Sequence, residues 1–106
     1  MSTIQIKTGD TYPPIEATIT QADGTPLDIT GATVKFHMND MSGVNKINAA
    51  GTIISPTGGE VRYTWATTST YLGRYVGEFE ITLLTGKVLT VPNDGHLVIY
   101  FNDDLA

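Results

Sequence analysis

Apolar side chains alternate with polar ones along most of this 106-residue chain. In the segment EFEIT, for example, Glu78 and Glu80 alternate with Phe79 and Ile81. Neighbouring side chains of an extended strand point to opposite faces, so a period of two marks a strand that is buried on one face and wet on the other. The same alternation recurs at residues 15–20, 33–38, 60–65 and 74–83. It predicts an all-β protein.

Turn-forming sequences separate these segments, among them ADGTP, SPTGG, LTGK and PNDGH. Asp-Gly and Gly-Gly adopt positive φ with little strain. Proline has no backbone N–H to donate to a neighbouring strand. Turn signals at intervals of about 8 to 12 residues predict an antiparallel β-sandwich of about seven to nine short strands, joined by Greek-key connections. At most one short helical turn is expected, near residues 66–72, where Thr and Ser offer N-caps and Gly73 a C-cap.

Weaker strand signals complete the expected set. They lie at residues 3–7, 46–50, 52–55 and 87–91. The segment HLVIYF is apolar on both faces, which is typical of a central or doubly covered strand. The length fits a single domain over residues 1–106, with an N-terminal arm at 1–14 and a short acidic tail at 103–106.

Composition excludes several classes of protein. Charged residues make up 16% of the chain, against about 25% in average globular proteins, which argues against disorder. A net charge of −5 and six dispersed basic residues argue against a nucleic-acid partner. No segment approaches the roughly 20 apolar residues of a membrane span, and the first residues lack a secretory signal. Without cysteine, stability has to come from burial and strand pairing.

Glu78 and Glu80 are the strongest candidates for a catalytic pair. At positions i and i+2 of one strand their side chains are roughly 6 to 7 Å apart, within the range that glycosidases use. A glycosidase, however, holds its carboxylates across a cleft, whereas carboxylates on an open strand face are solvated. We therefore expect the pair to mark the solvent-exposed face of a strand and the protein not to be an enzyme. A small glycan-active enzyme that uses this pair is one alternative hypothesis.

The remaining polar residues support no catalytic motif. His37 and His96 have no nucleophile motif beside them, and PTGGE lacks the Lys and Ser/Thr of a phosphate-binding loop. Oxygen ligands for calcium are available at Asn93, Asp94 and residues 102–104, but turn chemistry and a solvated terminus explain the same residues. We expect no cofactor, no metal and no small-molecule substrate.

Several aromatic and apolar residues are predicted to be structural. The predicted core includes Phe36, Trp65, Phe79 and Ile81. For Trp65 the alternative is stacking on a sugar at the lip of the sandwich. Gly73 and Tyr75 at the start of a long strand suggest a tyrosine corner, whose hydroxyl bonds backbone a few residues upstream. The alternative is that Tyr75 is simply a core aromatic.

Several segments of the sequence resemble a known protein family. The opening, GDTYPPIEATITQADGTPLDITGATVKFHM, resembles the N-terminal domain of the phage baseplate upper protein family. The segments GGEVRYTW, LGRYVGEFEIT and VPNDGHLVIYFNDDL are similar to its later part, so the likeness covers nearly the whole chain. It implies an Ig-like β-sandwich in a non-enzymatic virion protein, assembled in the host cytoplasm, with other phage structural proteins as partners and self-association expected.

The resemblance leaves the place in the particle open. Larger family members continue into helical regions that carry receptor-binding proteins, whereas this sequence ends at residue 106. A baseplate, tail, neck or capsid-associated module all fit, and a secreted or surface adhesion module that binds carbohydrate or a host protein is the main rival.

The N-terminal arm is our predicted subunit contact, because it combines a short strand with a stiff GDTYPP segment. The predicted contact residues are Ile4, Ile6, Tyr12, Pro13 and Pro14. The alternative is that the arm is an ordinary edge strand and its lead-in.

Overall fold

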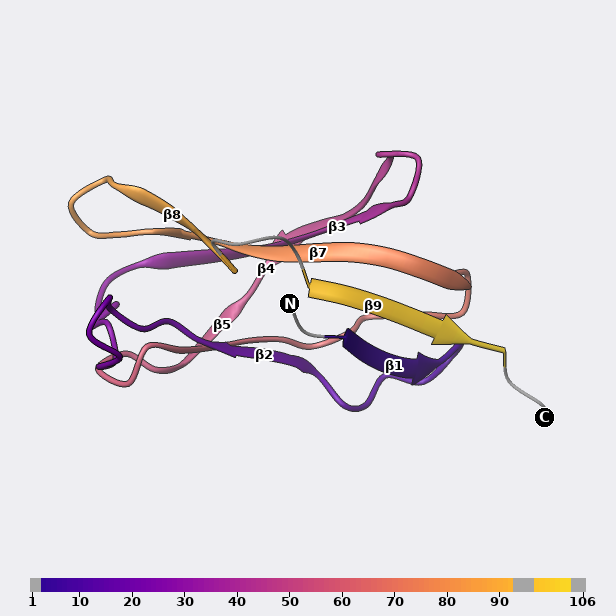
Figure 1. Ribbon diagram of the computed structural model, residues 1–106, viewed down its shortest axis with the longest axis horizontal. Helices are drawn as coiled ribbons and strands as arrows, with labels where there is room; N and C mark the ends of the chain where they lie inside the picture. Colours follow the sequence, from indigo (N-terminus) through magenta and orange to yellow (C-terminus); the bar gives the residue numbers. More distant parts are fainter. Residues whose placement is uncertain (1–2, 93–96, 104–106) are drawn as a thin grey trace.

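The computed structural model describes residues 3–92 and 97–103. Its nine strands are β1 (Thr3–Lys7), β2 (Ile15–Thr18), β3 (Thr33–Asp40), β4 (Asn45–Ala50), β5 (Thr52–Ser55), β6 (Glu60–Tyr63), β7 (Gly73–Thr82), β8 (Val88–Val91) and β9 (Leu97–Asn102). They form two layers in an elongated molecule (Figure 1), with extents of 45 × 24 × 23 Å. The predicted all-β sandwich is confirmed, and no helix occurs in the described residues, so none there could span a membrane.

The large sheet has the order β1-β9-β7-β3-β4, with β8 also paired to β7, and the small sheet has the order β2-β6-β5. Every pairing is antiparallel except one. β1 runs parallel to β9, with Thr3 beside Val98 and Lys7 beside Asn102. The predicted antiparallel sandwich describes the other pairings, whereas β1 and β9 are joined by no hairpin that would force them antiparallel.

β7 is the longest strand and the spine of the large sheet. One side of it pairs with β3 from Tyr75 to Thr82, and the other side pairs with β9 through its first half and with β8 through its second. Gly77 lies at the crossing, where a Cβ atom would approach Phe36 Cζ and Ile99 Cδ1 to 3.0 Å. Glycine therefore lets the facing side chains pack directly against the β7 backbone.

The core lies between the sheets and follows the alternation of the sequence. Phe36, Phe79 and Ile81 are fully buried, and Trp65 is 3% exposed. The Phe36 ring stacks on the ring of Tyr63 at a centroid distance of 4.6 Å. Trp65 meets the rings of Phe36, Tyr63 and Phe101 edge-on. Such edge-to-face contacts add about 0.5–1.5 kcal/mol to what burial contributes.

Candidate subunit-contact site

Glu78 and Glu80 lie side by side on the outer face of the large sheet. In the register of β3 with β7, Glu78 is opposite His37 and Glu80 is opposite Lys35. Both carboxylates are half-buried by neighbours on the same open face. No second carboxylate faces either one across a cleft from the described part of the chain, so their arrangement matches the predicted wet face of a strand.

The other polar candidates do not assemble into a site. The Nε2 atom of His37 is buried without a hydrogen-bond partner among the described residues. No group of three or more His, Cys, Asp or Glu side chains that could hold a metal occurs in residues 3–92 and 97–103. His96, Asn93, Asp94 and Asp104 lie outside the described residues.

Tyr75 makes the contact expected of a tyrosine corner. Its hydroxyl accepts a hydrogen bond of 3.3 Å from the backbone N–H of Leu72, three residues upstream. Gly73 between them has a φ of +89°, which glycine adopts without strain. The Tyr75 ring lies edge-on to the ring of Tyr71. Burial raises the pKa of Tyr71, and the neighbouring Tyr75 raises it further.

A buried threonine clamps the connection between β1 and β2. Thr68 is fully buried. Its hydroxyl donates a hydrogen bond of 2.6 Å to the carbonyl oxygen of Asp10 and accepts one of 2.9 Å from the N–H of Gly9. Thr8 adds a hydrogen bond of 2.7 Å from its hydroxyl to the carbonyl oxygen of Tyr71. These bonds fix residues 8–10 against the connection that precedes β7.

The core tryptophan provides a second anchor. Trp65 Nε1 donates a hydrogen bond of 3.1 Å to the carbonyl oxygen of Pro13. The sequence analysis placed Trp65 in the core but did not foresee this bond, and it missed Thr68 altogether. Nothing in the Thr-rich segment around Thr68 distinguishes this one hydroxyl from its exposed neighbours.

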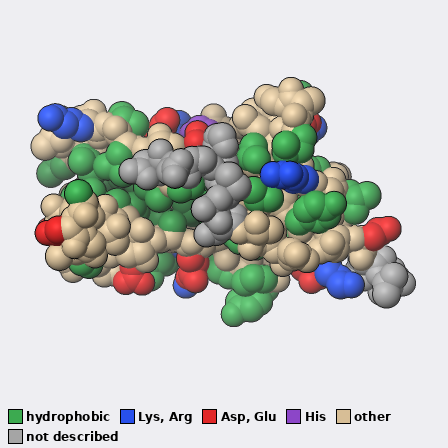
Figure 2. All heavy atoms as spheres, viewed as in Figure 1, with side chains coloured by type: hydrophobic (Ala, Val, Ile, Leu, Met, Phe, Trp, Pro, Cys, Tyr) green, Lys and Arg blue, Asp and Glu red, His purple; other side chains and the backbone are tan. Residues whose placement is uncertain are grey.

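Between the two anchors Tyr12 projects into solvent. Its side chain is 80% exposed, and Pro13 is exposed beside it, whereas Pro14 is half-buried. Figure 2 shows hydrophobic side chains projecting at the lower margin of the molecule, where Figure 1 places the connection between β1 and β2. Two hollows flank Tyr12, of about 300 Å³ towards Gln5 and Lys7 and about 310 Å³ towards Glu16 and Arg62.

The predicted contact residues therefore separate into two groups. Tyr12, Pro13 and Pro14 form the projecting segment. Ile6 is 4% exposed and Ile4 is half-buried, and both pack against the core. Any contact made by β1 would accordingly use its backbone and its outward side chains.

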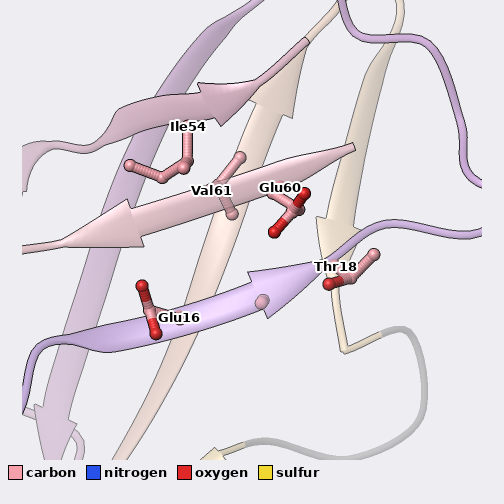
Figure 3. A pocket seen from close by; sticks show the side chains of 6 residues that line it. Glu16, Thr18, Ile54, Glu60 and Val61 are labelled. Atoms are coloured by element: carbon pink, nitrogen blue, oxygen red, sulfur yellow. The ribbon is translucent and has the colours of Figure 1, made fainter. Parts of the chain in front are cut away.

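A further hollow of about 240 Å³ lies on the outer face of the small sheet (Figure 3). Glu16 and Thr18 from β2, Glu60 from β6 and Ile54 from β5 surround it. Glu16 is bound by Arg62, whose Nη2 atom lies 2.6 Å from Glu16 Oε2. The depression holds no constellation of acid, base and nucleophile among the described residues.

Comparison with known proteins identifies the fold and the family. The crystal structure of CopC from Methylosinus trichosporium OB3b is similar, with a TM-score of 0.60 and 9% identity, over 100% of this chain and 89% of that chain. At that identity the likeness shows the fold alone. The comparison with curated proteins found no match. A family model described as the BppU N-terminal domain matches residues 1–93, as the resemblance predicted. The chain therefore belongs to the BppU N-terminal domain family of phage baseplate structural proteins.

Proposed function

We propose that this virion protein is a non-enzymatic module that binds neighbouring subunits of the particle through Tyr12, Pro13 and Pro14. The observation that carries the proposal is the 80% exposure of Tyr12 on a backbone that Thr68 and Trp65 hold from both sides. An anchor that is fixed before binding loses little conformational freedom when a partner covers it. Tyrosine is also among the residues that most often dominate the binding energy of an interface.

The surroundings of Tyr12 suit a protein interface. The two flanking hollows can receive side chains of a partner, and their walls carry Asp10, Glu16 and Arg62 as a polar rim. An apolar centre inside a polar rim is the usual plan of such interfaces. The proposed partners are other structural proteins of the phage, together with further copies of this chain, assembled in the host cytoplasm.

Two observations support a role without catalysis or nucleic acid. Glu78 and Glu80 share an open sheet face instead of a cleft. The net charge of −5 disfavours contact with a phosphate backbone. Membership in a baseplate family favours a virion role over the secreted adhesion module that the sequence left open.

Replacing Tyr12 by alanine in the encoding phage tests the proposal. If Tyr12 is a central anchor, its loss should lower the number of copies per purified virion by roughly tenfold or more, because a dominant contact contributes at least about 2 kcal/mol. Quantitative mass spectrometry of the virions measures this number. Leu84→Ala is the matched control, since Leu84 is 79% exposed on the β7–β8 hairpin. Equal incorporation of the Tyr12→Ala protein and the control would refute the proposed contact.

A further inference from the structure

The large sheet has a vacant strand position beside β8. β8 and β9 pair with the same side of β7 and follow each other along it. β1 covers the far side of β9 from Thr3 to Lys7. In the part of the chain that the structure describes, no strand lies on the far side of β8. The edge of the sheet is therefore complete beside β9 and one strand short beside β8.

The backbone groups of β8 that face this vacant position have no partner strand. The N–H of Leu83 donates a hydrogen bond of 2.7 Å to the carbonyl oxygen of Lys87, so this pair begins the ladder of the β7–β8 hairpin. Bonded and non-bonded pairs alternate along an antiparallel ladder, so Val88 and Thr90 direct their backbone groups away from β7. Within the described residues no hydrogen bond reaches those outward groups.

Three other strand edges are occupied or irregular. On the far side of β1 the carbonyl oxygen of Lys7 accepts a hydrogen bond of 3.0 Å from the N–H of Asp10. Register shifts interrupt the pairing of β4 with β3 and of β5 with β6. Such features discourage strand addition. β8, by contrast, keeps an unbroken register with β7 from Val88 to Val91 and carries no charged side chain.

A groove of about 470 Å³, the β8 groove, opens from this edge towards the core. Leu89 and Val91 line it from β8, and Ile19 and Ala22 line it from the segment that follows β2. Leu89 and Val91 point towards the core but are only half-buried, whereas the inward side chains of β9 are at most 8% exposed. In the left half of Figure 2, hydrophobic side chains are visible between the two layers. The core is therefore incompletely covered at β8.

We propose that the β8 groove binds an extended segment of another virion protein, which adds to β8 as a further strand of the large sheet. Its backbone groups bond to those of Val88 and Thr90, in the mode known as β-augmentation. Every second side chain of the segment is apolar and enters the groove over Leu89 and Val91. An extended backbone offers donors and acceptors at the spacing of a strand edge, whereas a helix uses its own internally.

Charge indicates the composition of the segment. Beside the groove the acidic side chains are Glu60 opposite Thr18, Glu80 opposite Thr90, and Asp23 next to Ala22, and the basic ones are Lys35 opposite Glu80 and Lys87 before β8. With the net charge of −5, this balance favours a segment that carries Lys or Arg at its solvent-facing positions. It disfavours a second copy of this chain, which has the same net charge.

Amide hydrogen exchange in purified virions and in the purified chain tests the inference, with mass spectrometry at single-residue resolution. In the purified chain the amides of Val88 and Thr90 should exchange faster than those of Leu89 and Val91, which bond to β7. In virions the exchange of Val88 and Thr90 should slow at least tenfold, because the added strand bonds to them. Unchanged exchange at both residues would overturn the proposal.

A photo-reactive side chain identifies the occupant. Val88 is 59% exposed, so Val88→p-benzoylphenylalanine places a cross-linker beside the vacant position. In virions it should link to a segment of another virion protein in which apolar residues alternate with polar or basic ones. A link to a second copy of this chain, or to a segment without that alternation, would overturn the proposal.

A backbone variant shows whether the outward N–H matters. In the cross-linking protein, Thr90→Pro removes this N–H and leaves the bonds to β7 in place, so the fold should persist by circular dichroism. The cross-link yield per incorporated copy should fall at least tenfold, whereas Thr90→Val keeps the N–H and should retain the yield. Equal yields from the two folded variants would overturn the proposal, and if Thr90→Pro does not fold, the exchange measurement on the wild type decides. Because yield is counted per incorporated copy, a failure of the Tyr12 contact does not imitate a failure here.

Discussion

The hydroxyl of Thr68 donates a hydrogen bond of 2.6 Å to the carbonyl oxygen of Asp10, across 58 residues of sequence. The same hydroxyl accepts the N–H of Gly9, so one buried side chain satisfies two backbone groups of the β1–β2 connection. This clamp holds the start of the segment that presents Tyr12.

Replacing Thr68 by valine keeps the shape of the side chain and removes the clamp. The Gly9 N–H and the Asp10 carbonyl then lose their partner in a partly buried place, which should lower the free energy of unfolding by about 1–3 kcal/mol in urea titrations. Thr68→Ser keeps the hydroxyl and serves as the control. Equal stability of the two variants would show that the hydroxyl is not what matters.

The tyrosine corner can be tested by removing a single oxygen. Tyr75→Phe deletes the acceptor of the Leu72 N–H and should cost about 0.5–1.5 kcal/mol of unfolding free energy. The matched control is Tyr100→Phe, at a 44% exposed tyrosine on β9, which should change stability by less than about 0.5 kcal/mol. If both variants unfold at the same urea concentration as the wild type, the hydroxyl contact contributes nothing.

Gly77 should not tolerate a side chain. A methyl group there meets Phe36 and Ile99 at 3.0 Å, and such overpacking typically costs about 1–3 kcal/mol. Ile99→Val removes the Cδ1 atom in question, so the double variant should recover part of the loss made by Gly77→Ala. Thermal or urea unfolding of the four proteins gives the coupling energy, and strictly additive losses would contradict the proposed contact.

Turn carboxylates should make stability fall in acid. The Ser42 hydroxyl holds the pKa of Asp40 below its usual 3.8, helped by the Val44 N–H and by Lys46. Hydrogen bonds from Thr25 and Thr30 likewise lower the pKa values of Asp23 and Asp28. Because the folded pKa values lie below the unfolded ones, this stabilisation is complete above pH 3.8 and disappears as the pH falls through the folded values.

Urea titrations between about pH 5 and pH 2 measure this dependence. A variant with asparagine at positions 23, 28 and 40 should show a shallower decline than the wild type, because these amides do not titrate. Identical declines would mean that other groups control acid unfolding.

Much of the fold could be predicted because the alternation is local and strong. Phe79 and Ile81 enter the core, and Glu78 and Glu80 leave it, by strand geometry alone. The pairing of the strands could not be predicted in the same way. The segment at residues 3–7 carries no local sign that it runs parallel to β9, because its partner is chosen by tertiary packing of residues from the other end of the chain.

The candidate site was predictable to the same extent. Two adjacent prolines after Tyr12 indicate a stiff, extended segment, so the arm could be predicted from the sequence as a contact segment. Its attachment could not, because the hydrogen bonds from Thr68 and Trp65 join residues more than 50 positions apart and neither residue type signals such a role. The expected helical turn near residues 66–72 is a non-helical turn that positions Thr68.

The parallel pairing of β1 with β9 also sets the order in which the domain can be completed during synthesis. β1 leaves the ribosome well before β9, and because Thr3 pairs with Val98, β1 has no partner in the sheet until the rest of this domain has emerged. At about 5–20 residues per second, β1 waits for several seconds or longer. In that interval its outward and inward edges are both free, and a nascent chain on the same message offers an identical strand. Pairing of β1 with β9 of the same chain therefore competes with premature pairing to a neighbouring nascent chain.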